Sequence, residues 1–564
     1  MKLKKLLATT LVLAMTASMF AGCGKKEETS TPTEGTTAAG TEATTAAADP
    51  AANPYPGTPG EGEITINIAS EPPQLFTVTT TDTTSFTVIR HVIENLVSLD
   101  ENDKVAPGVA TDWTVSDDGL VYTFNLRQDM KWSNGEPVTA NDFVFAWKSL
   151  LTPSFAADYA YFGYIFKNGQ AYNEGTVGAD ELGFKALSDY QLEVTLENPA
   201  SYFLDTLAFG VFAPLNEKAY NEFGEAYGTD ADKMAFNGAY KISSWEHESK
   251  LVLEKNPDYY NAANIEIEKI NMVMINDANA AMNAFKAGEV DVIGVNGEQS
   301  AMMKAESYPV TTYDDGSVWY LEYNLNDPYL ANANLRKALT YAIDKQTFVD
   351  AILKNSSKPA VSFTAPAING LNDKFANEVG ALVPTLDAAK AKEYYDLALQ
   401  ELGVDSIELT MISDDSDTAI DNAAFVQEQL RTNLGIEITV ESMPFKSRLE
   451  RMSNKDFSIV FAGWGPDYND PMTFLDMFET GNGNNHTSYT SEAYDALLDQ
   501  VRAELDPATR MGYLMDLEKL LMEDMPIGPV YWRSRDYIMS GKIASGVLRT
   551  AFQDMNYKFA KLAK

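Results

Sequence analysis

One short segment of the chain places charged, aromatic and glycine residues where a ligand could bind. Residues 461–471 read FAGWGPDYNDP, in which an apolar run reaches two glycines and a tryptophan, and Asp467, Tyr468, Asn469 and Asp470 follow. Such a pattern is typical of an ordinary turn after a strand. Carboxylates beside aromatic rings also suit a site that holds a positively charged group. The segment therefore allows two interpretations, and the elements around it must decide between them.

Other residues that commonly do chemistry are sparse and scattered. The three histidines, His91, His247 and His486, are far apart in sequence, and Cys23 is the single cysteine. The sequence carries no HExxH or CxxC spacing for a metal, no GxSxG nucleophile turn and no phosphate-binding glycine loop. We expect each histidine to be a surface or hydrogen-bonded polar residue.

Two further interpretations of the acidic segment lack support in the sequence. Residues 467–470 partly resemble a calcium loop but lack the remaining ligands and the central glycine of an EF-hand. Paired carboxylates also serve glycosidases, yet no acid of raised pKa can be identified from sequence. We therefore predict no catalytic residues, no metal site and no cofactor.

Length and charge bound the class of protein. A chain of 564 residues is too long for one core and should form several domains. Its 45% hydrophobic and 22% charged residues are ordinary for a globular protein. The net charge of -38 argues against nucleic acid as a partner, because phosphates would be repelled. Such acidity favours solubility through self-repulsion, or else a cationic ligand.

The N-terminus has the features of an export signal. Residues 1–22 carry three lysines within the first five positions, an apolar run and small residues before Cys23. This end resembles a bacterial lipobox, although Phe20 stands where leucine is usual, and it implies lipid modification of Cys23. An ordinary secretory signal is the alternative. Residues 23–62 are rich in Thr, Ala, Gly, Pro and Glu, which predicts a disordered tether with a reach of about 30 Å.

Periodicity predicts the elements that position residues 461–471. We expect a strand at 64–70, a helix near 85–95, a hairpin turning at Asp118-Gly119 and a helix capped near Thr139 or Asn141. Further along we expect a strand at 318–326 and a long helix at 333–353. From Asp387 helices and strands alternate: helix 388–402, strand 407–413, helix 419–434, strand 436–442, a short helix and strand 457–464. Alternation indicates a parallel sheet, whose ligands bind beyond the carboxyl ends of its strands. Residues 463–470 follow such an end.

Several stretches together resemble the family 5 extracellular solute-binding proteins of ABC importers, particularly the oligopeptide-binding kind. The most specific is 108–154, GVATDWTVSDDGLVYTFNLRQDMKWSNGEPVTANDFVFAWKSLLTPS, and others are NGAYKISSWEHESKLVLEKNPDYYN, EYNLNDPYLANANLRKAL and GWGPDYNDPMTFLDMF. The likeness runs from about Ile64 to the C-terminus. It implies an α/β fold of the two-lobed periplasmic-binding-protein type II, with an extra inserted domain and a hinge that closes the lobes over a central cleft.

The resemblance also suggests how the chain is divided. The predicted parts are a signal peptide (1–22), a lipid-anchored disordered linker (23–62), lobe I in three parts (63–105, 233–316 and 534–564), an inserted smaller domain (106–232) and lobe II (317–533). No reaction is implied. The domain boundaries are soft and follow from where β-rich sequence gives way to alternation.

The same resemblance suggests which residues hold a ligand. In relatives a peptide lies extended between the lobes like an added strand, and an acidic residue of the DYN motif, here Asp467, pairs with its α-amino group. Implied ligand-binding residues are Asp467, Gly463, Trp464, Gly465, Tyr468, Asn469, Glu322, Tyr320 and Phe445. The two glycines would let a ligand backbone approach, and Trp464 would wall a side-chain pocket. For Asp470, which precedes a proline, we expect a turn or helix-capping role.

One departure concerns the end of the ligand. Relatives that grip a peptide carboxylate use basic residues around 448–461, and here Phe461 replaces one of them. Arg448 and Arg451 lie nearby in sequence. The sequence therefore leaves peptide length preference open.

These features predict an extracytoplasmic lipoprotein that captures oligopeptides and delivers them to a membrane permease. Expected partners are the peptide, ABC permease subunits and the membrane through the lipid anchor, with no nucleic acid, and we expect a monomer. Its place would be the extracytoplasmic face of the cell membrane, the outer surface of a Gram-positive-type cell or otherwise the periplasm. Alternatives are another solute (dipeptide, nickel chelate, haem or oligosaccharide) and a peptide-sensing or chaperone lipoprotein. An envelope hydrolase is disfavoured, since nucleophile and metal motifs are missing.

Overall fold

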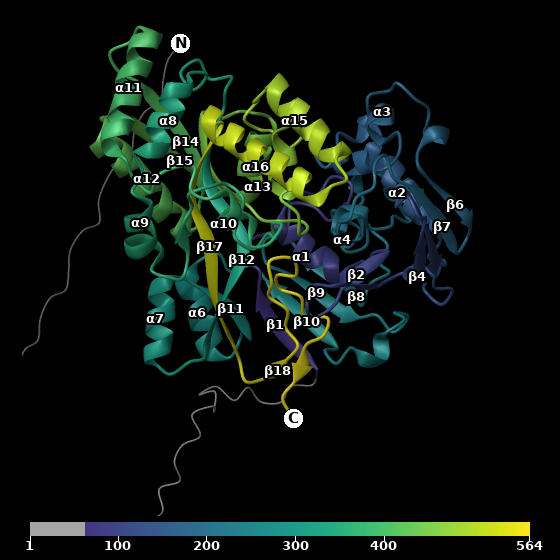
Figure 1. The fold of residues 1–564 in the computed structure, drawn as a ribbon. Coiled ribbons are helices and arrows are strands. Elements are labelled where there is room, and N and C mark those ends of the chain that lie inside the picture. The colour runs from purple at the N-terminus through teal and green to yellow at the C-terminus, as the bar shows by residue number, and fades with distance from the viewer. Residues whose placement is uncertain (1–61) are drawn as a thin grey trace, which may run out of the picture. The chain divides into compact units, whose positions relative to one another are not determined.

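A mixed sheet forms the framework of residues 62–564, the part of the chain that the computed structural model describes (Figure 1). Ten strands follow the order β15-β14-β16-β12-β17-β11-β1-β10-β9-β8, and β13 pairs with β17 as the eleventh. Their bounds are β1 Glu63–Asn67, β8 Tyr240–Glu246, β9 Lys250–Lys255, β10 Lys269–Val273, β11 Val292–Val295, β12 Val310–Tyr323, β13 Lys358–Pro359, β14 Glu408–Asp414, β15 Glu437–Met443, β16 Ile459–Trp464 and β17 Ile527–Met539. The predicted signal peptide, Cys23 and almost all of the linker lie outside the described residues.

Two long antiparallel strands, β12 and β17, carry the sheet from one lobe to the other. Residues 310–314 pair with 534–538 beside β11, and residues 318–322 pair with 527–532 beside β16. Between them the register of β12 shifts, and Gly316 has φ of +73° there. A glycine suits this position because a left-handed backbone costs it no Cβ strain. Figure 1 shows β17 passing between the α11 and α12 region and the β11 region. The predicted boundary at 316/317 falls inside β12.

The alternating part of the chain folds as predicted, into parallel strands with helices between them. Strands β14, β15 and β16 pair in parallel, and the helices are α11 Ala388–Leu402, α12 Asp417–Leu434 and α13 Phe445–Ser453. Helices α11 and α12 end at Gly403 and Gly435, whose φ angles of +70° and +73° close the last turns. Strand β12 runs antiparallel to β16, so the complete sheet is mixed.

The prediction of one long helix over 333–353 is wrong. Helix α8 ends early (Ala333–Tyr341), and a short α9 (Lys345–Thr347) and a π-helical segment (Phe348–Leu353) follow. The cause is Asp344, whose carboxylate accepts from the backbone N–H of Thr347 and so begins a new helix. Amphipathic spacing continues across the break, which is why periodicity did not reveal it.

The inserted region has its own four-stranded antiparallel sheet, ordered β4-β5-β7-β6. The predicted hairpin joins β4 and β5 with Gly119 at φ +71°, and the helix predicted near Thr139 begins there. Its third residue, Asp142, accepts from the backbone N–H of Thr139 at 2.7 Å. The bounds are β4 Ala110–Val115, β5 Val121–Leu126, β6 Phe184–Ser188, β7 Gln191–Thr195, α2 Ala140–Leu151, α3 Gly169–Asn173, α4 Phe203–Thr206 and α5 Glu217–Phe223.

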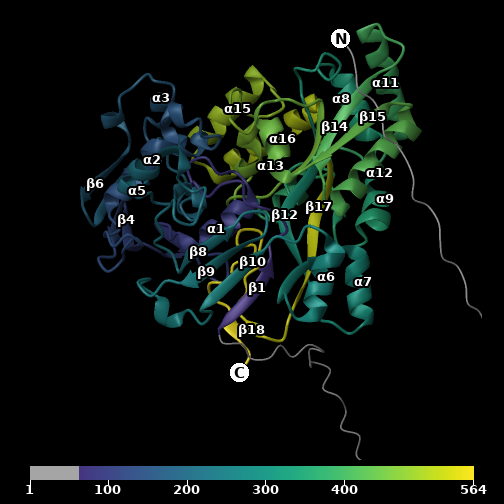
Figure 2. The same ribbon diagram turned by 180° about the vertical axis from the view of Figure 1, so that it is seen from behind.

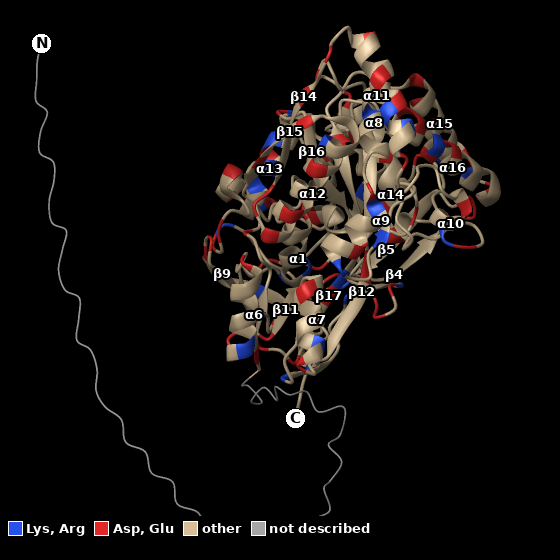
Figure 3. Ribbon diagram, turned by 90° about the vertical axis from the view of Figure 1, so that its left-hand side faces the viewer, with Lys and Arg blue, Asp and Glu red and all other residues tan. Residues whose placement is uncertain are grey.

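The remaining elements cover the framework. They are α1 Thr83–Val92, α6 Ala278–Ala287, α7 Gly297–Ala305, α10 Phe375–Val379, α14 Met472–Leu475, α15 Glu492–Ala503, α16 Pro507–Asp524, β2 Val97–Leu99, β3 Val105–Pro107, β18 Ile543–Ser545 and β19 Lys561–Leu562. Figure 2 shows from behind that α6 and α7 lie beside β17, at the opposite end from α8 and α11. Asp and Glu residues are spread over many elements rather than gathered on one (Figure 3). Within residues 62–564, no helix is both long and apolar enough to span a membrane.

Candidate functional site

The segment predicted as a ligand site sits where β16 leaves the sheet. Trp464 is the last residue of β16 and pairs with Val318 of β12. The chain then folds back onto α14, because the backbone N–H of Asp467 donates to the Thr473 hydroxyl at 2.9 Å. The indole of Trp464 donates to the Thr473 carbonyl at 2.8 Å. These contacts fix Asp467 just beyond the carboxyl end of a parallel strand, as predicted.

Asp467 is a carboxylate that lacks a cationic partner. None of the described residues forms an ion pair with it, and its carboxylate accepts a hydrogen bond from the hydroxyl of Tyr159, which lies 3.3 Å from Oδ2 and 3.5 Å from Oδ1. Burial raises the pKa of Asp467 well above its usual range, and the Tyr159 hydrogen bond opposes this only in part. Asp467 is half-buried, and a partly desolvated carboxylate is stabilised by a proton or by an incoming cation. The position is therefore suited to an ammonium group.

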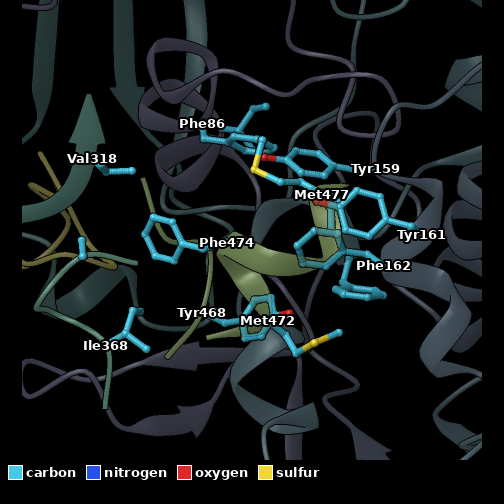
Figure 4. Close-up of a cluster of buried hydrophobic side chains, with 14 of the residues drawn as sticks. Phe86, Tyr159, Tyr161, Phe162, Val318, Ile368, Tyr468, Met472, Phe474 and Met477 are labelled. Carbon is cyan, nitrogen blue, oxygen red and sulfur yellow. The ribbon is translucent and has the colours of Figure 1, made fainter. Parts of the chain in front are cut away.

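Aromatic side chains of the inserted region pack against this segment. Tyr159 meets the Trp464 ring edge-on at 6.1 Å, and Phe162 meets Tyr468 edge-on at 5.6 Å. Tyr202 stacks on Tyr468 at 5.6 Å and 14°. Figure 4 shows Tyr159, Tyr161 and Phe162 in one buried cluster with Tyr468 and Met472. The sequence signalled these residues only as an aromatic run at 158–166, without indicating what they contact.

The structure gives the glycine before Trp464 a packing reason. A Cβ at Gly463 would lie 2.7 Å from the indole of Trp319, which occupies the space above it. A Cβ at Gly465 would lie 3.2 Å from the Ser317 hydroxyl. Packing against Trp319 is therefore enough to require a glycine at position 463, whether or not a ligand backbone approaches it. Approach of a ligand backbone to these glycines stays a prediction.

Asp470 has the structural role expected of it. Its Oδ1 accepts from the backbone N–H of Met472 at 3.1 Å, at the start of α14. Both its oxygens also accept from the guanidinium of Arg510, at 2.8 and 2.9 Å. Asp470 is therefore neutralised within the fold, in contrast to Asp467.

Three other predicted ligand residues lie away from this loop. Tyr320 is buried against Phe363, and Glu322 is buried with His486 Nδ1 at 3.4 Å. Phe445, half-buried, begins α13 beneath the guanidinium of Arg448. Two cavities, of about 100 and 1020 Å³, adjoin residues 467–470, and none of the three residues lines either of them, so their ligand roles stay predictions.

The basic residues near the motif already have carboxylate partners. Arg448 donates to Asp414 at 2.6 Å, and Arg451 donates to Glu441 at 2.6 Å. Phe461, at the position where relatives carry a base, is buried and packs edge-on to Trp319 at 5.7 Å. A peptide carboxylate therefore finds no unpaired guanidinium at these three positions.

The histidines have polar partners, as expected. Burial lowers the pKa of His91 to about 3, and its Nε2 accepts from the Tyr557 backbone N–H at 3.0 Å. His247 lies between the carboxylates of Glu71 and Asp230, at 2.8 and 3.1 Å. Among residues 62–564, no group of three or more His, Cys, Asp or Glu side chains is arranged to hold a metal ion.

A cavity of about 100 Å³ adjoins Asp467, Tyr468 and Asn469. Its opposite wall comes from α1 and from the C-terminal segment, including Phe86, Arg90 and Phe552. Elsewhere, Asn276 donates to Asp415 at 3.4 Å, and Gly316, Pro466 and Ala551 lie close together. Segments on both sides of the cleft thus touch, which is a closed arrangement.

Comparison with known proteins identifies the family. The family model described as "Bacterial extracellular solute-binding proteins, family 5 Middle" matches residues 104–486. The chain is 33% identical to the oligopeptide-binding protein OppA of Bacillus subtilis over 519 residues, which cover 88% of this chain and 93% of that protein. It resembles the structure of Listeria monocytogenes OppA bound to peptide with a TM-score of 0.85 and 34% identity, covering 90% of this chain and all of that one.

Two structures of the murein tripeptide-binding protein MppA bear on conformation. Both are 26% identical to this chain and cover 89% of it. One Escherichia coli structure matches with a TM-score of 0.82 and 98% of its length covered, whereas the unliganded open form matches at 0.59 with 97% covered. The contacts across the cleft and the lower TM-score against the open form both indicate that the described arrangement is not the open one. By the match of the family model and of these relatives, the chain belongs to the bacterial extracellular solute-binding proteins of family 5.

Proposed function

We propose that this protein is the substrate-binding component of an ABC importer and captures oligopeptides between its two lobes. The observation that carries the proposal is Asp467, a half-buried carboxylate without an ion-pair partner among residues 62–564, which lies at the end of a parallel strand beside aromatic residues of the inserted region. A peptide's α-ammonium supplies the missing cation. A charge-assisted hydrogen bond of this kind contributes roughly 1.5–3 kcal/mol, enough to fix the direction of the bound chain.

The surrounding residues support an extended ligand. A peptide lying beside Gly463 and Gly465 would bond main chain to main chain, which makes recognition independent of side-chain sequence. Trp464, Tyr468 and Asn469 would then line the first side-chain position. Similar proteins are named for binding oligopeptides, dipeptides and a murein tripeptide, which supports the peptide class without fixing peptide length.

Delivery and location complete the proposal. Cys23 would carry the lipid that holds the protein at the extracytoplasmic face of the membrane, and residues 23–62 would let the lobes reach a permease. The loaded, closed protein docks on that permease, and a partner ATPase supplies the energy. Catalysis has no part in this scheme.

The test is calorimetry with trialanine and pentaalanine, each with a free or an acetylated N-terminus. We expect the free peptides to bind at micromolar affinity or tighter and acetylation to abolish binding. Asp467→Asn should weaken the free peptides by roughly 10- to 150-fold, the equivalent of one lost charge-assisted contact. Native mass spectrometry of the purified protein gives an independent view of any retained peptide.

A matched control is available in the same lobe. Asp405 is an exposed carboxylate after α11, and Asp405→Asn should leave peptide affinity unchanged. If acetylated and free peptides bind equally, Asp467 is not the ammonium anchor. If no peptide of any length binds while another solute does, the peptide class itself is wrong.

A further inference from the structure

A second and larger cavity, of about 1020 Å³, opens next to the motif but does not include Asp467. It shares Tyr468 and Asn469 with the smaller cavity and lies between the inserted region and the α14–α16 part of lobe II. Tyr161 and Phe162 form its inner wall on one side, and Tyr468 and Met472 form it on the other (Figure 4). Because the inserted region and lobe II each contribute walls, the complete cavity exists only when these two parts are packed together.

Two buried polar atoms at this cavity have no hydrogen-bond partner of regular geometry among residues 62–564. They are Oδ1 of Asp476 and the hydroxyl of Tyr161, and each of these residues is only 6% exposed. Burial raises the pKa of Tyr161 well above its usual range, the negative charges of Asp476 and Asp467 add to this, and the side chain of Asn484 opposes it. Tyr161 and Asp476 both line this cavity. The other carboxylate oxygen of Asp476 has only the Tyr468 hydroxyl, at 3.5 Å. A buried carboxylate this poorly bonded is costly unless a proton or a cation reaches it.

The bases that line the cavity do not neutralise Asp476. Arg502 gives both its terminal nitrogens to Glu479, at 2.7 and 2.8 Å, and Arg510 gives both to Asp470. Burial raises the pKa of Asp476 well above its usual range, and Arg502 lowers it only in part. In the described arrangement the carboxyl group of Asp476 therefore favours its protonated form, and a bound ligand cation would replace that proton.

The rest of the lining matches an aliphatic cation. The rim carries the carboxylates of Asp118, Glu174, Glu197, Asp499 and Glu504. Two of its leucines, Leu371 and Leu505, are 45% and 65% exposed. One aromatic residue of the wall already makes a cation–π interaction, since the guanidinium of Arg510 lies 4.9 Å from the centre of the Tyr202 ring. Acidic rim, apolar edge and aromatic wall together suit a charged amine on a hydrocarbon chain.

We infer that this cavity is a second binding site, distinct from the Asp467 anchor, for a primary ammonium group on an aliphatic chain. The ammonium lies between Asp476 Oδ1 and the Tyr161 hydroxyl, the hydrocarbon packs against Phe162 and Met472, and a second ammonium of a polyamine reaches the rim. Occupation holds the inserted region against lobe II and so favours closure. The same chemistry has two sources, a free polyamine or the lysine side chain of a captured peptide.

The test uses the purified full chain and saturation-transfer NMR with calorimetry. The probes are 1,5-diaminopentane and its neutral counterpart 1,5-pentanediol. We expect the diamine and not the diol to bind saturably, and Asp476→Asn to weaken the diamine at least tenfold. Asp405→Asn, at an exposed carboxylate that lines neither cavity, should leave its affinity unchanged. Tyr161→Phe keeps the ring, removes one partner and should give an intermediate loss.

Peptide arms separate the two sources. Lys-Ala-Ala and norleucine-Ala-Ala differ only in the ammonium, so a loss confined to the lysine peptide in Asp476→Asn identifies a peptide side chain as occupant. Loss of diamine binding in that variant identifies a free amine instead. If neither the diamine nor the lysine peptide responds to Asp476→Asn, the site is refuted. Asp467→Asn should leave diamine binding intact, so failure of the peptide proposal and failure of this one are distinguishable.

Discussion

A single methyl group at the register shift of β12 should hold the lobes apart. In the described arrangement an added Cβ at Gly316 would lie 2.9 Å from Ala551 Cβ in the C-terminal segment and 2.9 Å from Pro466 Cγ in the ligand loop. Gly316→Ala therefore places a wedge where the C-terminal segment, the hinge and the ligand loop meet. An open arrangement relieves this contact, whereas a closed one must absorb it.

The cost has two parts of different kinds. At φ of +73°, any residue other than glycine costs about 1–2 kcal/mol, whether the lobes are open or closed. Overpacking adds about 1–3 kcal/mol, and this part applies only to the closed form. Since closure accompanies tight binding, the closed-state part alone weakens peptide affinity by about 5- to 150-fold.

Gly175 provides the matched control, because its φ is +74° and an added Cβ there meets nothing within 4 Å. Gly175→Ala carries the backbone strain without the wedge. Both variants should lower the thermal midpoint, and only Gly316→Ala should lose trialanine affinity by calorimetry and fail to contract with peptide in small-angle scattering. Equal peptide affinities in the two variants would refute the hinge assignment.

Three further predictions concern protonation. Burial raises the pKa of Asp467, so peptide capture should release a proton, and affinity should fall up to tenfold per pH unit below that pKa; calorimetry in buffers of different ionisation enthalpy measures this. Hydrogen bonds to Asp230 and Glu71 raise the pKa of His247, so its stabilisation is present below the unfolded value and lost as pH rises; His247→Gln should lower the thermal midpoint more at pH 5.5 than at pH 8.5, and an equal effect contradicts it. Burial lowers the pKa of Lys345 from 10.5 to about 7, so the buried ammonium destabilises the fold more at pH 7 than at pH 10. Relative to the unmodified protein, Lys345→Met should therefore have a higher thermal midpoint at pH 7 than at pH 10, and no difference between the two pH values would contradict this.

Local signals in the sequence predicted local structure well. The turn at Gly119, the helix start at Thr139 and the helix ends at Gly403 and Gly435 each depend on a few neighbouring residues, and each was found as expected. Alternation likewise predicted parallel strands and the place of residues 461–471 at a strand end. The helix break at Asp344 could not be predicted from periodicity, because the apolar spacing continues across it while the Asp344 side chain caps a new helix.

Contacts between distant segments were not predictable from one sequence. Nothing in residues 158–166 indicates that Tyr159 reaches Asp467, which is 308 positions away. Similarly, the two glycines suggested a ligand backbone, whereas Trp319 lies against Gly463. No pattern in the sequence marks Asp476, because only the fold shows that one of its oxygens lacks a partner among the described residues. Such long-range pairing determines the electrostatics of the site.

The β12–β17 ribbon limits how the two lobes can move. Its hydrogen bonds continue on both sides of the shift at residues 314–318, so one lobe cannot slide past the other without breaking a ladder. Bending at the shift breaks none of these pairs. Opening is therefore a rotation about a short backbone segment, and only contacts near that segment resist it. Because β12 and β17 are shared by both lobes, unfolding of one lobe removes strand pairs that also stabilise the other. The two lobes should accordingly melt as one cooperative unit despite lying on opposite sides of a hinge.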